Sequence, residues 1–417
     1  MMTKFDFNTA LYFLGAGASC DAGMPTAIQL EARIREAIKG QPLTVAIYDF
    51  VKGSIETHIK EYGYYGESRG TLDIEDIIAG IRSLSMLSKS LTLPFFSLNV
   101  EELWHIIITT HGYNKHYYER FDSPPTKVQF IENCVRQALE SIHTCLIDIL
   151  RTTNIEKLQY LLPLLNKGLI APLDIFTLNF DDTIESLVDT RPELKKIFTD
   201  GFKEYTDTSM LFPSSRNIPG AFSRHHNCYI YQDNWSDSAS RINLYKEHGS
   251  IDYCYIGREI IKIREKNYPP YPSLLGTPKS FQKGNYSPHV IFGKADKLRL
   301  EGLHLLHKLR ESLESKNYVC VVGYSFRDSH INIHLEEWLI NNKNAVLCIV
   351  TPDIRSALTS LRNGAFKLQA SISATQRIFL IESTFANLTA SRAFQNGIVL
   401  LKNGSKWLTI DSLQLVV

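Results

Sequence analysis

Small residues follow a short apolar run near the start of the chain. Leu11-Tyr12-Phe13-Leu14 leads into Gly15-Ala16-Gly17-Ala18-Ser19. Small residues let a backbone turn tightly and approach a pyrophosphate, whose charge is met by N–H groups at a helix start. The Ser19 hydroxyl adds a further donor. The alternative is a tight turn between a strand and a helix that binds no ligand.

A second polar group is the segment Thr177-Leu178-Asn179-Phe180-Asp181-Asp182, which comes directly after another apolar run. The Asn179 amide both donates and accepts hydrogen bonds, so it is suited to orienting a water or a sugar hydroxyl. Asp181 or Asp182 adds negative charge or orders the loop. Asn and Asp are also frequent turn formers, so a purely structural turn is the alternative.

His248 lies in the segment Glu247-His248-Gly249. An imidazole has a pKa near neutrality and is suited to accepting a proton from a hydroxyl or a water. Gly249 leaves room for a substrate. The alternative is a structural role, since the chain has 13 histidines. Neither the pair His225-His226 nor the pair His304 and His307 has partners at convincing metal spacing, and no metal is predicted.

A fourth group is Gly323-Tyr324-Ser325, which follows the apolar run 318–322. Small and hydroxylated residues at this place fit contact with the ribose of a nucleotide. The alternative is another turn between a strand and a helix, with Asp328 as the helix N-cap.

The elements that must position these residues are short strands and following helices. Apolar runs predict strands over 11–14, 173–177, 318–322 and 345–350. Helical spacing predicts helices over 26–39 and 328–341. Strands that alternate with helices predict an α/β fold, a Rossmann-like doubly wound parallel sheet that binds ligands at the carboxyl ends of its strands.

Between residues 45 and 165 the pattern changes. Helical spacing dominates over 72–88, 126–152 and 155–166, without a strong strand pattern. We therefore expect a large helical insertion in a catalytic domain of residues 1–360. Residues 361–417 are expected to form a small C-terminal extension.

Composition limits the classes of function. Lys and Arg number 45 and Asp and Glu 44, which gives a net charge of +1 and argues against a chain that acts mainly by non-specific nucleic-acid contacts. The 7 cysteines are scattered, without a Cys-x-x-Cys pair, which favours a reducing, cytoplasmic setting. Apolar runs fall short of the roughly 20 residues that span a bilayer, so no membrane association is expected.

The order of the four groups resembles the sirtuin superfamily, whose members consume NAD. The resemblance covers residues 8–40, 171–186 and 244–352. It implies that the first glycine loop binds the NAD phosphates, that Asn179 holds the nicotinamide-ribose side and that His248 is the catalytic histidine. Gly323-Tyr324-Ser325 takes the adenosine side. The predicted cofactor-binding residues are Gly15, Ala16, Gly17, Ala18, Ser19, Thr177, Gly323, Tyr324 and Ser325.

The departures from deacetylating sirtuins are informative. Those enzymes continue from the glycine loop into Pro-Asp-Phe-Arg, whereas this chain has Pro25-Thr26-Ala27-Ile28. They carry a four-cysteine zinc ribbon after the His-Gly motif, and here Cys254 alone lies nearby. An acyl-lysine-binding strand is not recognisable. Protein deacetylation is therefore disfavoured.

These departures make the chain similar to bacterial sirtuin-like NADases of anti-phage defence. The acidic helix start at 71–78 is also common in that group. In its length and in the lack of other recognisable domains, the chain resembles the stand-alone subunit that pairs with a HerA-type hexameric ATPase.

The resemblance implies an NAD⁺ glycohydrolase that releases nicotinamide and ADP-ribose as the effector of abortive infection. Asn179, His248 and Asp181 are the predicted catalytic residues, and NAD is the substrate. Gating by homo-oligomerisation or a partner ATPase is expected, with nucleic acid contacted only indirectly if at all. The alternatives are an NAD- or ADP-ribose-binding regulatory subunit without turnover and a nuclease-associated subunit of a HerA-type complex.

Overall fold

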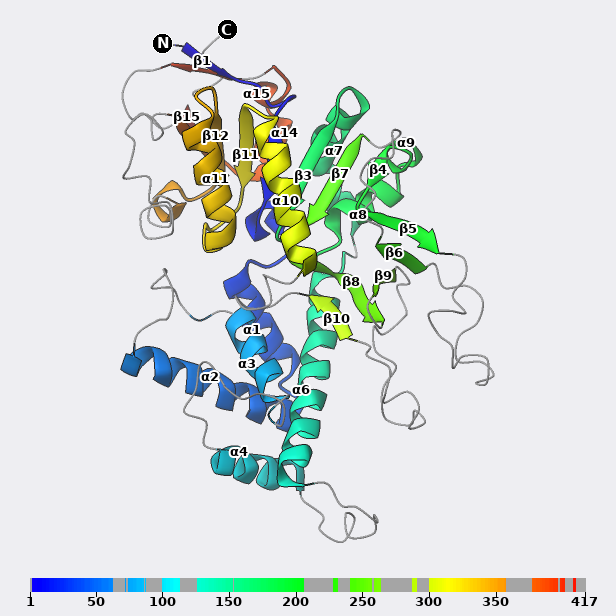
Figure 1. Ribbon diagram of the computed structural model, residues 1–417, viewed down its shortest axis with the longest axis vertical. Coiled ribbons are helices and arrows are strands. Elements are labelled where there is room, and N and C mark those ends of the chain that lie inside the picture. Colours follow the sequence, from blue (N-terminus) through cyan, green and yellow to red (C-terminus); the bar gives the residue numbers. More distant parts are fainter. Residues whose placement is uncertain are drawn as a thin grey trace. The chain divides into compact units, whose positions relative to one another are not determined.

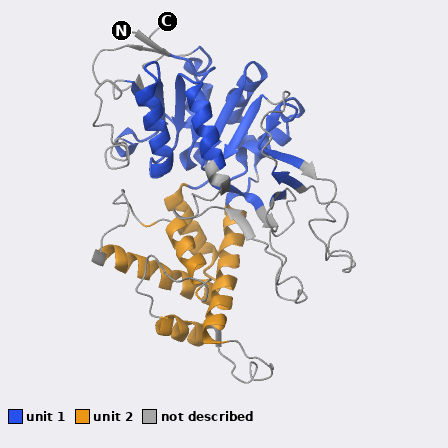
Figure 2. Cartoon of the chain, viewed as in Figure 1, with its two compact units in different colours: residues 1–25, 150–291, 297–417 blue, residues 26–149, 292–296 orange. Residues whose placement is uncertain are grey.

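The computed structural model divides the chain into two compact units. Its described residues are 2–62, 72, 74–85, 87, 100–112, 126–152, 154–205, 228–231, 241–256, 259–263, 287–290, 300–357, 377–396, 398–401 and 408–409. The first unit comprises residues 1–25, 150–291 and 297–417, and the second comprises 26–149 and 292–296 (Figure 2).

The centre of the first unit is a parallel sheet of eight strands in the order β15-β13-β12-β11-β2-β3-β7-β4 (Figure 1). Its strands are β2 (Leu11–Leu14), β3 (Leu173–Thr177), β4 (Phe198–Thr199), β7 (Ile242–Lys246), β11 (Tyr318–Val322), β12 (Val346–Thr351), β13 (Ile378–Glu382) and β15 (Leu408–Thr409). Strands β3, β7 and β4 lie on one side of β2, whereas β11, β12, β13 and β15 lie on the other. The predicted doubly wound α/β fold is confirmed, and its topological switch point lies between β2 and β11.

Helices cover both faces of this sheet, so its strands are apolar throughout rather than alternating. Tyr12 and Leu14 pack on one face, against η3 (Ile155–Leu161), α7 (Leu162–Leu165), α8 (Thr183–Asp189) and α14 (Phe385–Ala390). Leu11 and Phe13 pack on the other, against α10 (Leu300–Glu314) and α11 (Ser329–Asn341). In Figure 1, α10 and α11 run side by side across this face.

The predicted strands 173–177 and 318–322 are observed with the same bounds, and β12 begins one residue later than predicted. The first glycine loop differs from the prediction of a loop followed directly by a helix. Its residues 16–19 belong to a 3₁₀ helix, η1 (Ala16–Ala22), which precedes α1 (Ala27–Ala37). Gly23 ends η1 because it adopts a left-handed conformation (φ 89°), and the capping box of Thr26 and Gln29 starts α1.

The first unit also contains an antiparallel sheet in the order β10-β8-β9-β6-β5, which was not predicted. Its strands are β5 (Phe202–Tyr205), β6 (Cys228–Tyr231), β8 (Gly249–Ile256), β9 (Glu259–Ile263) and β10 (Ser287–Val290). Strand β8 begins directly after His248, so this sheet anchors the histidine loop.

The remaining elements of the unit are short. They are β1 (Met2–Phe5), paired with β14 (Ile398–Leu401), and η4 (Asn166–Leu169), α9 (Pro192–Lys195) and α15 (Arg392–Asn396). Strand β13 lies in the segment predicted as a C-terminal extension, yet it pairs in parallel with β12. The proposed boundary at residue 360 stays a prediction.

The described part of the second unit is helical. It contains α1, α2 (Pro42–Tyr62), α3 (Ile74–Leu84), α4 (Val100–Ile107), a π-helix (Ile108–Gly112) and most of α6 (Lys127–Leu150). Tyr48 and Lys52 of α2 both donate to Glu31 of α1, at 2.8 and 3.0 Å. Thr71 and Asp73 of the predicted acidic helix start lie outside the described residues, as do His225 and His226. Among the described helices, none has the length and apolar character needed to cross a membrane.

Candidate functional site

Two glycine loops meet at the carboxyl edge of the parallel sheet, where β2 and β11 end. The Gly17 N–H donates to the Gly323 carbonyl at 3.0 Å, and the Gly15 N–H donates to the Val322 carbonyl at 2.9 Å. A Cβ on Gly323 would lie 2.4 Å from the Ala18 nitrogen, and Gly323 has a φ of +62°. These glycines are therefore required by the close approach of the two loops and by the backbone turn.

Three backbone N–H groups of the first loop already donate hydrogen bonds within the protein, so they are not available to a phosphate. The N–H groups of Gly15 and Gly17 already donate to the second loop, and that of Ala18 donates to the Gly15 carbonyl at 2.9 Å. The Tyr160 hydroxyl donates to the Ala18 carbonyl at 2.8 Å and holds the loop from η3. The predicted role of residues 15–19 in phosphate binding stays a prediction.

The end of β3 is joined to the first glycine loop by side chains. The Asn179 amide nitrogen donates to the Ser19 hydroxyl at 3.0 Å, and both residues are buried. The Thr177 hydroxyl donates to the Leu14 carbonyl and accepts from the Asn179 N–H. Within the described part of the chain, Asn179 Oδ1 is buried without a hydrogen-bond partner. A buried acceptor of this kind fits a water or a ligand hydroxyl.

The two aspartates after Asn179 serve the local turn. Asp181 Oδ1 accepts from the N–H and the hydroxyl of Thr183, at 3.2 and 2.6 Å, at the start of α8. Asp182 Oδ1 accepts from the Thr152 N–H at 2.8 Å. Burial raises the pKa of Asp182 above its usual value, although this hydrogen bond partly offsets the rise. Both carboxylates thus hold loops, the alternative weighed from the sequence, and a catalytic role of Asp181 stays a prediction.

Beneath this turn lies Lys246, a residue that sequence reasoning did not select. Its ammonium group forms a buried ion pair with Glu185 of α8 at 2.9 Å and also donates to the Ser250 hydroxyl at 2.8 Å and the Asp181 carbonyl. Burial alone would lower the pKa of Lys246, but the neighbouring carboxylates, foremost Glu185, raise it. The charged lysine therefore ties the loop after β3 to the loop after β7.

His248 is buried, with 2% of its surface exposed, in the turn that links β7 to β8. Gly249 has a φ of +78°, so glycine is needed for this turn. Burial raises the pKa of the adjacent Glu247 carboxyl well above its usual range, which disfavours its charged form.

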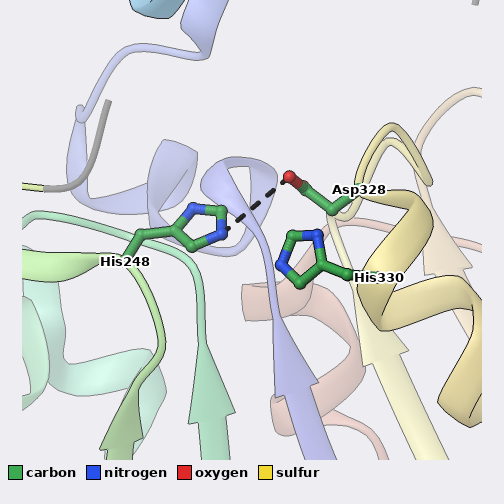
Figure 3. A group of neighbouring side chains, drawn as sticks. All are labelled: His248, Asp328 and His330. Atoms are coloured by element: carbon green, nitrogen blue, oxygen red, sulfur yellow. Dashed lines mark ion pairs between the residues drawn. The ribbon is translucent and has the colours of Figure 1, made fainter. Parts of the chain in front are cut away.

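His248 faces residues from the far side of the switch point (Figure 3). Strands β7 and β11 are three positions apart, roughly 14 Å at the usual strand spacing. Nevertheless, His248 Nε2 lies 3.9 Å from Asp328 Oδ1, and the ring centroids of His248 and His330 lie 5.9 Å apart. Their loops therefore meet over the ends of β2 and β3.

The residues of the predicted group Gly323-Tyr324-Ser325 differ in burial, since Tyr324 lies in the core and Ser325 at the surface. Tyr324 is buried against Phe13, and its hydroxyl bonds to Asn332 at 3.1 Å and to the backbone of Asp328. Ser325 is exposed. The following Phe326 is buried and has a φ of +55°, a rare conformation held in part by the Asn332 amide, which donates to its carbonyl at 2.8 Å. The Tyr324 side chain stabilises the loop, and Ser325 remains open to a ligand.

A cavity lies below these loops. Its lining includes Ala18, Ser19, Thr177, Asn179 and Asp181 of the predicted residues, together with Lys246 and Glu185. His248 and the second glycine loop lie outside this lining and complete the edge above it. The structure thus brings the four predicted groups to one edge of the sheet.

Comparison with known families agrees with this arrangement. Residues 174–373 match the family model of the SIR2-like domain. This part of the chain resembles SIR2-like domains. The match runs from β3 past β12, so it contains Asn179, His248 and Ser325 but not the first glycine loop. SIR2-like domains bind NAD, and the match therefore indicates an NAD-related activity. No curated protein matches the chain.

Proposed function

We propose that the chain hydrolyses NAD⁺ to nicotinamide and ADP-ribose at the carboxyl edge of the parallel sheet. The observation that carries this proposal is the buried Asn179, held by Ser19 with its own oxygen unsatisfied among the described residues, on the same edge as His248. An amide held in this way is preorganised to position a sugar hydroxyl or a water. The SIR2-like match supplies the class of nucleotide.

The reaction breaks the bond between the ribose carbon and the nicotinamide nitrogen. The electron pair of that bond leaves with nicotinamide, which is already cationic and becomes neutral, so no acid is needed. Positive charge develops on the ribose, and a water adds to the same carbon. The proposed role of Asn179 is to hold this water and the ribose hydroxyls, and His248 takes the proton that the water loses.

The proposed biological role is that of an effector in anti-phage abortive infection. An enzyme that destroys NAD would kill its host if it were always active, so its activity must be gated. We propose gating by homo-oligomerisation or by a HerA-type partner ATPase. This part of the proposal rests on the resemblance of the motifs to sirtuin-like defence proteins.

The test is the rate of nicotinamide release from NAD by the full chain, alone and with its partner ATPase. Loss of one preorganised hydrogen-bonding group costs about 100- to 1,000-fold in rate, and we expect at least this loss for Asn179→Ala and His248→Ala. His307→Gln is the matched control, because His307 is exposed on α10. Equal rates for all variants would contradict the assignment, and NAD binding without release would indicate a regulatory subunit instead.

A further inference from the structure

Three side chains at the candidate site place metal-binding atoms together (Figure 3). They are His248 after β7, Asp328 at the N-cap of α11 and His330 in the first turn of that helix. One ligand atom from each lies within 4.8 Å of the other two. We propose that these residues bind one divalent transition-metal ion, with Zn²⁺ as the best match, and that the bound ion blocks NAD cleavage.

The distance between His248 and Asp328 is longer than a direct hydrogen bond and leaves space for an ion between the two side chains. The 3.9 Å from His248 Nε2 to Asp328 Oδ1 exceeds the 2.7–3.2 Å of an N–H···O bond. Zinc takes nitrogen and carboxylate ligands at about 2.0–2.2 Å, so two ligands on one ion lie well over 3 Å apart. Small side-chain movements would bring all three atoms to those distances.

The chemistry of the ligands selects the metal. Two imidazoles and one carboxylate suit zinc and its neighbours in the first transition row, whereas Mg²⁺ and Ca²⁺ prefer oxygen ligands. Three protein ligands also leave a fourth position open, as in zinc sites that keep a water. His248 is buried while Asp328 and His330 are partly exposed, so the ion would enter from the α11 side.

Occupancy has a consequence for the reaction, and this half of the inference rests on the proposed function. A histidine binds a metal through the lone pair of a neutral ring nitrogen. The same lone pair of His248 is the proposed proton acceptor for the attacking water. While the ion holds Nε2 of His248, that nitrogen cannot take a proton, and we expect NAD cleavage to stop.

The binding half is tested on the full chain without NAD. Zn²⁺ is titrated by calorimetry, and Co²⁺ is followed by its visible absorption, which reports direct coordination. Wild type should bind one ion per chain, and Asp328→Asn and His330→Gln should each weaken binding at least about tenfold. The control His307→Gln should bind as wild type does, and Mg²⁺ should give no signal. Absence of Zn²⁺ binding, or equal affinity in folded variants, would overturn the site. Circular dichroism identifies folded variants.

The inhibition half is tested by adding Zn²⁺ to the NAD cleavage assay and then removing it with a chelator. We expect the wild-type rate to fall at least about tenfold and to recover on chelation, and the Zn²⁺ needed for half-inhibition to rise at least about tenfold in His330→Gln. Rates are compared with the metal-free rate of the same variant. An unchanged or higher rate with Zn²⁺ bound would overturn the inhibition. If no NAD is cleaved under any condition, the proposed function fails while the binding experiment still decides the site.

Discussion

Lys246 is a buried charge that links the Asn179 loop to the His248 loop. Its ammonium contacts Glu185, Ser250 and the Asp181 carbonyl, so its partners come from α8, β8 and the turn after β3. A buried ion pair of this kind adds little net stability over an apolar pair of similar volume, but removing one partner leaves an uncompensated charge. We therefore expect the pair to hold the Asn179 and His248 loops in register and to add little to the stability of the fold.

Replacing Lys246 by Met should lower the free energy of unfolding by about 3–5 kcal/mol, because Glu185 is then buried without its cation. The double variant Lys246→Met with Glu185→Leu should recover much of this loss, since neither charge remains. Denaturant unfolding of the single and double variants measures both values. A double variant no more stable than Lys246→Met would show that the pair is not the source of the effect.

At the residue scale the sequence indicated which segments matter but not every residue in them. The Asn179, His248 and glycine segments were found because they follow apolar runs. Lys246 was missed because its partner Glu185 lies 61 residues away. His330 was missed for the same reason, since only the crossing of two loops brings it to His248.

The two glycine loops lie at the switch point of the sheet, where β2 and β11 end. Gly323 combines a left-handed backbone with direct contact to Gly17 and Ala18. By contrast, a Cβ on Gly53, inside α2, would meet no atom within 4 Å. The two positions therefore predict opposite effects of one substitution.

We expect Gly323→Ala to cost about 1–2 kcal/mol from the backbone conformation alone, with more from the clash, and to weaken NAD binding. Gly53→Ala should stabilise the helical unit by about 0.5–1 kcal/mol, because glycine is unfavourable inside a helix. Denaturant unfolding of each variant, with NAD titration of the first, makes the comparison. A Gly323→Ala protein with wild-type stability would contradict the tight contact of the loops.

At the element scale, the parallel strands were predictable because strands buried on both faces are continuous apolar runs. Strands β3 and β11 illustrate this, since the bounds of both match the predicted ranges. The antiparallel sheet was not predictable, because strands such as β5 (Phe202–Tyr205) mix aromatic and charged residues without a clear period. The 3₁₀ helix η1 was missed because its small residues have no helical periodicity.

At the scale of the whole molecule, the candidate site and the helices α1 to α4 fall into different units. The residues of the candidate site all belong to the first unit, and the described part of the second is helical. One buried histidine gives the helical unit a pH dependence of its own. Burial, with a smaller contribution from Arg82, lowers the pKa of His143 in α6 to about 3.

His143 should make the helical unit less stable in acid. Above its unfolded pKa of about 6.5 the histidine is neutral in both states, and its contribution to stability is complete. As the pH falls from about 6.5 towards 3, the histidine binds a proton in the unfolded state but not in the folded state. The free energy of unfolding is therefore lower by about 2 kcal/mol at pH 5. Denaturant unfolding of wild type and His143→Leu between pH 7 and pH 5 measures this loss. An identical pH dependence in both proteins would contradict it.

The most direct test of NAD cleavage is mass spectrometry of the products formed in water labelled with heavy oxygen. The chain, with and without the proposed HerA-type ATPase, is incubated with NAD. We predict equal amounts of nicotinamide and ADP-ribose, with one labelled oxygen in each ADP-ribose and products lost in His248→Ala. Intact NAD under every condition, or the same products from His248→Ala, would contradict the account.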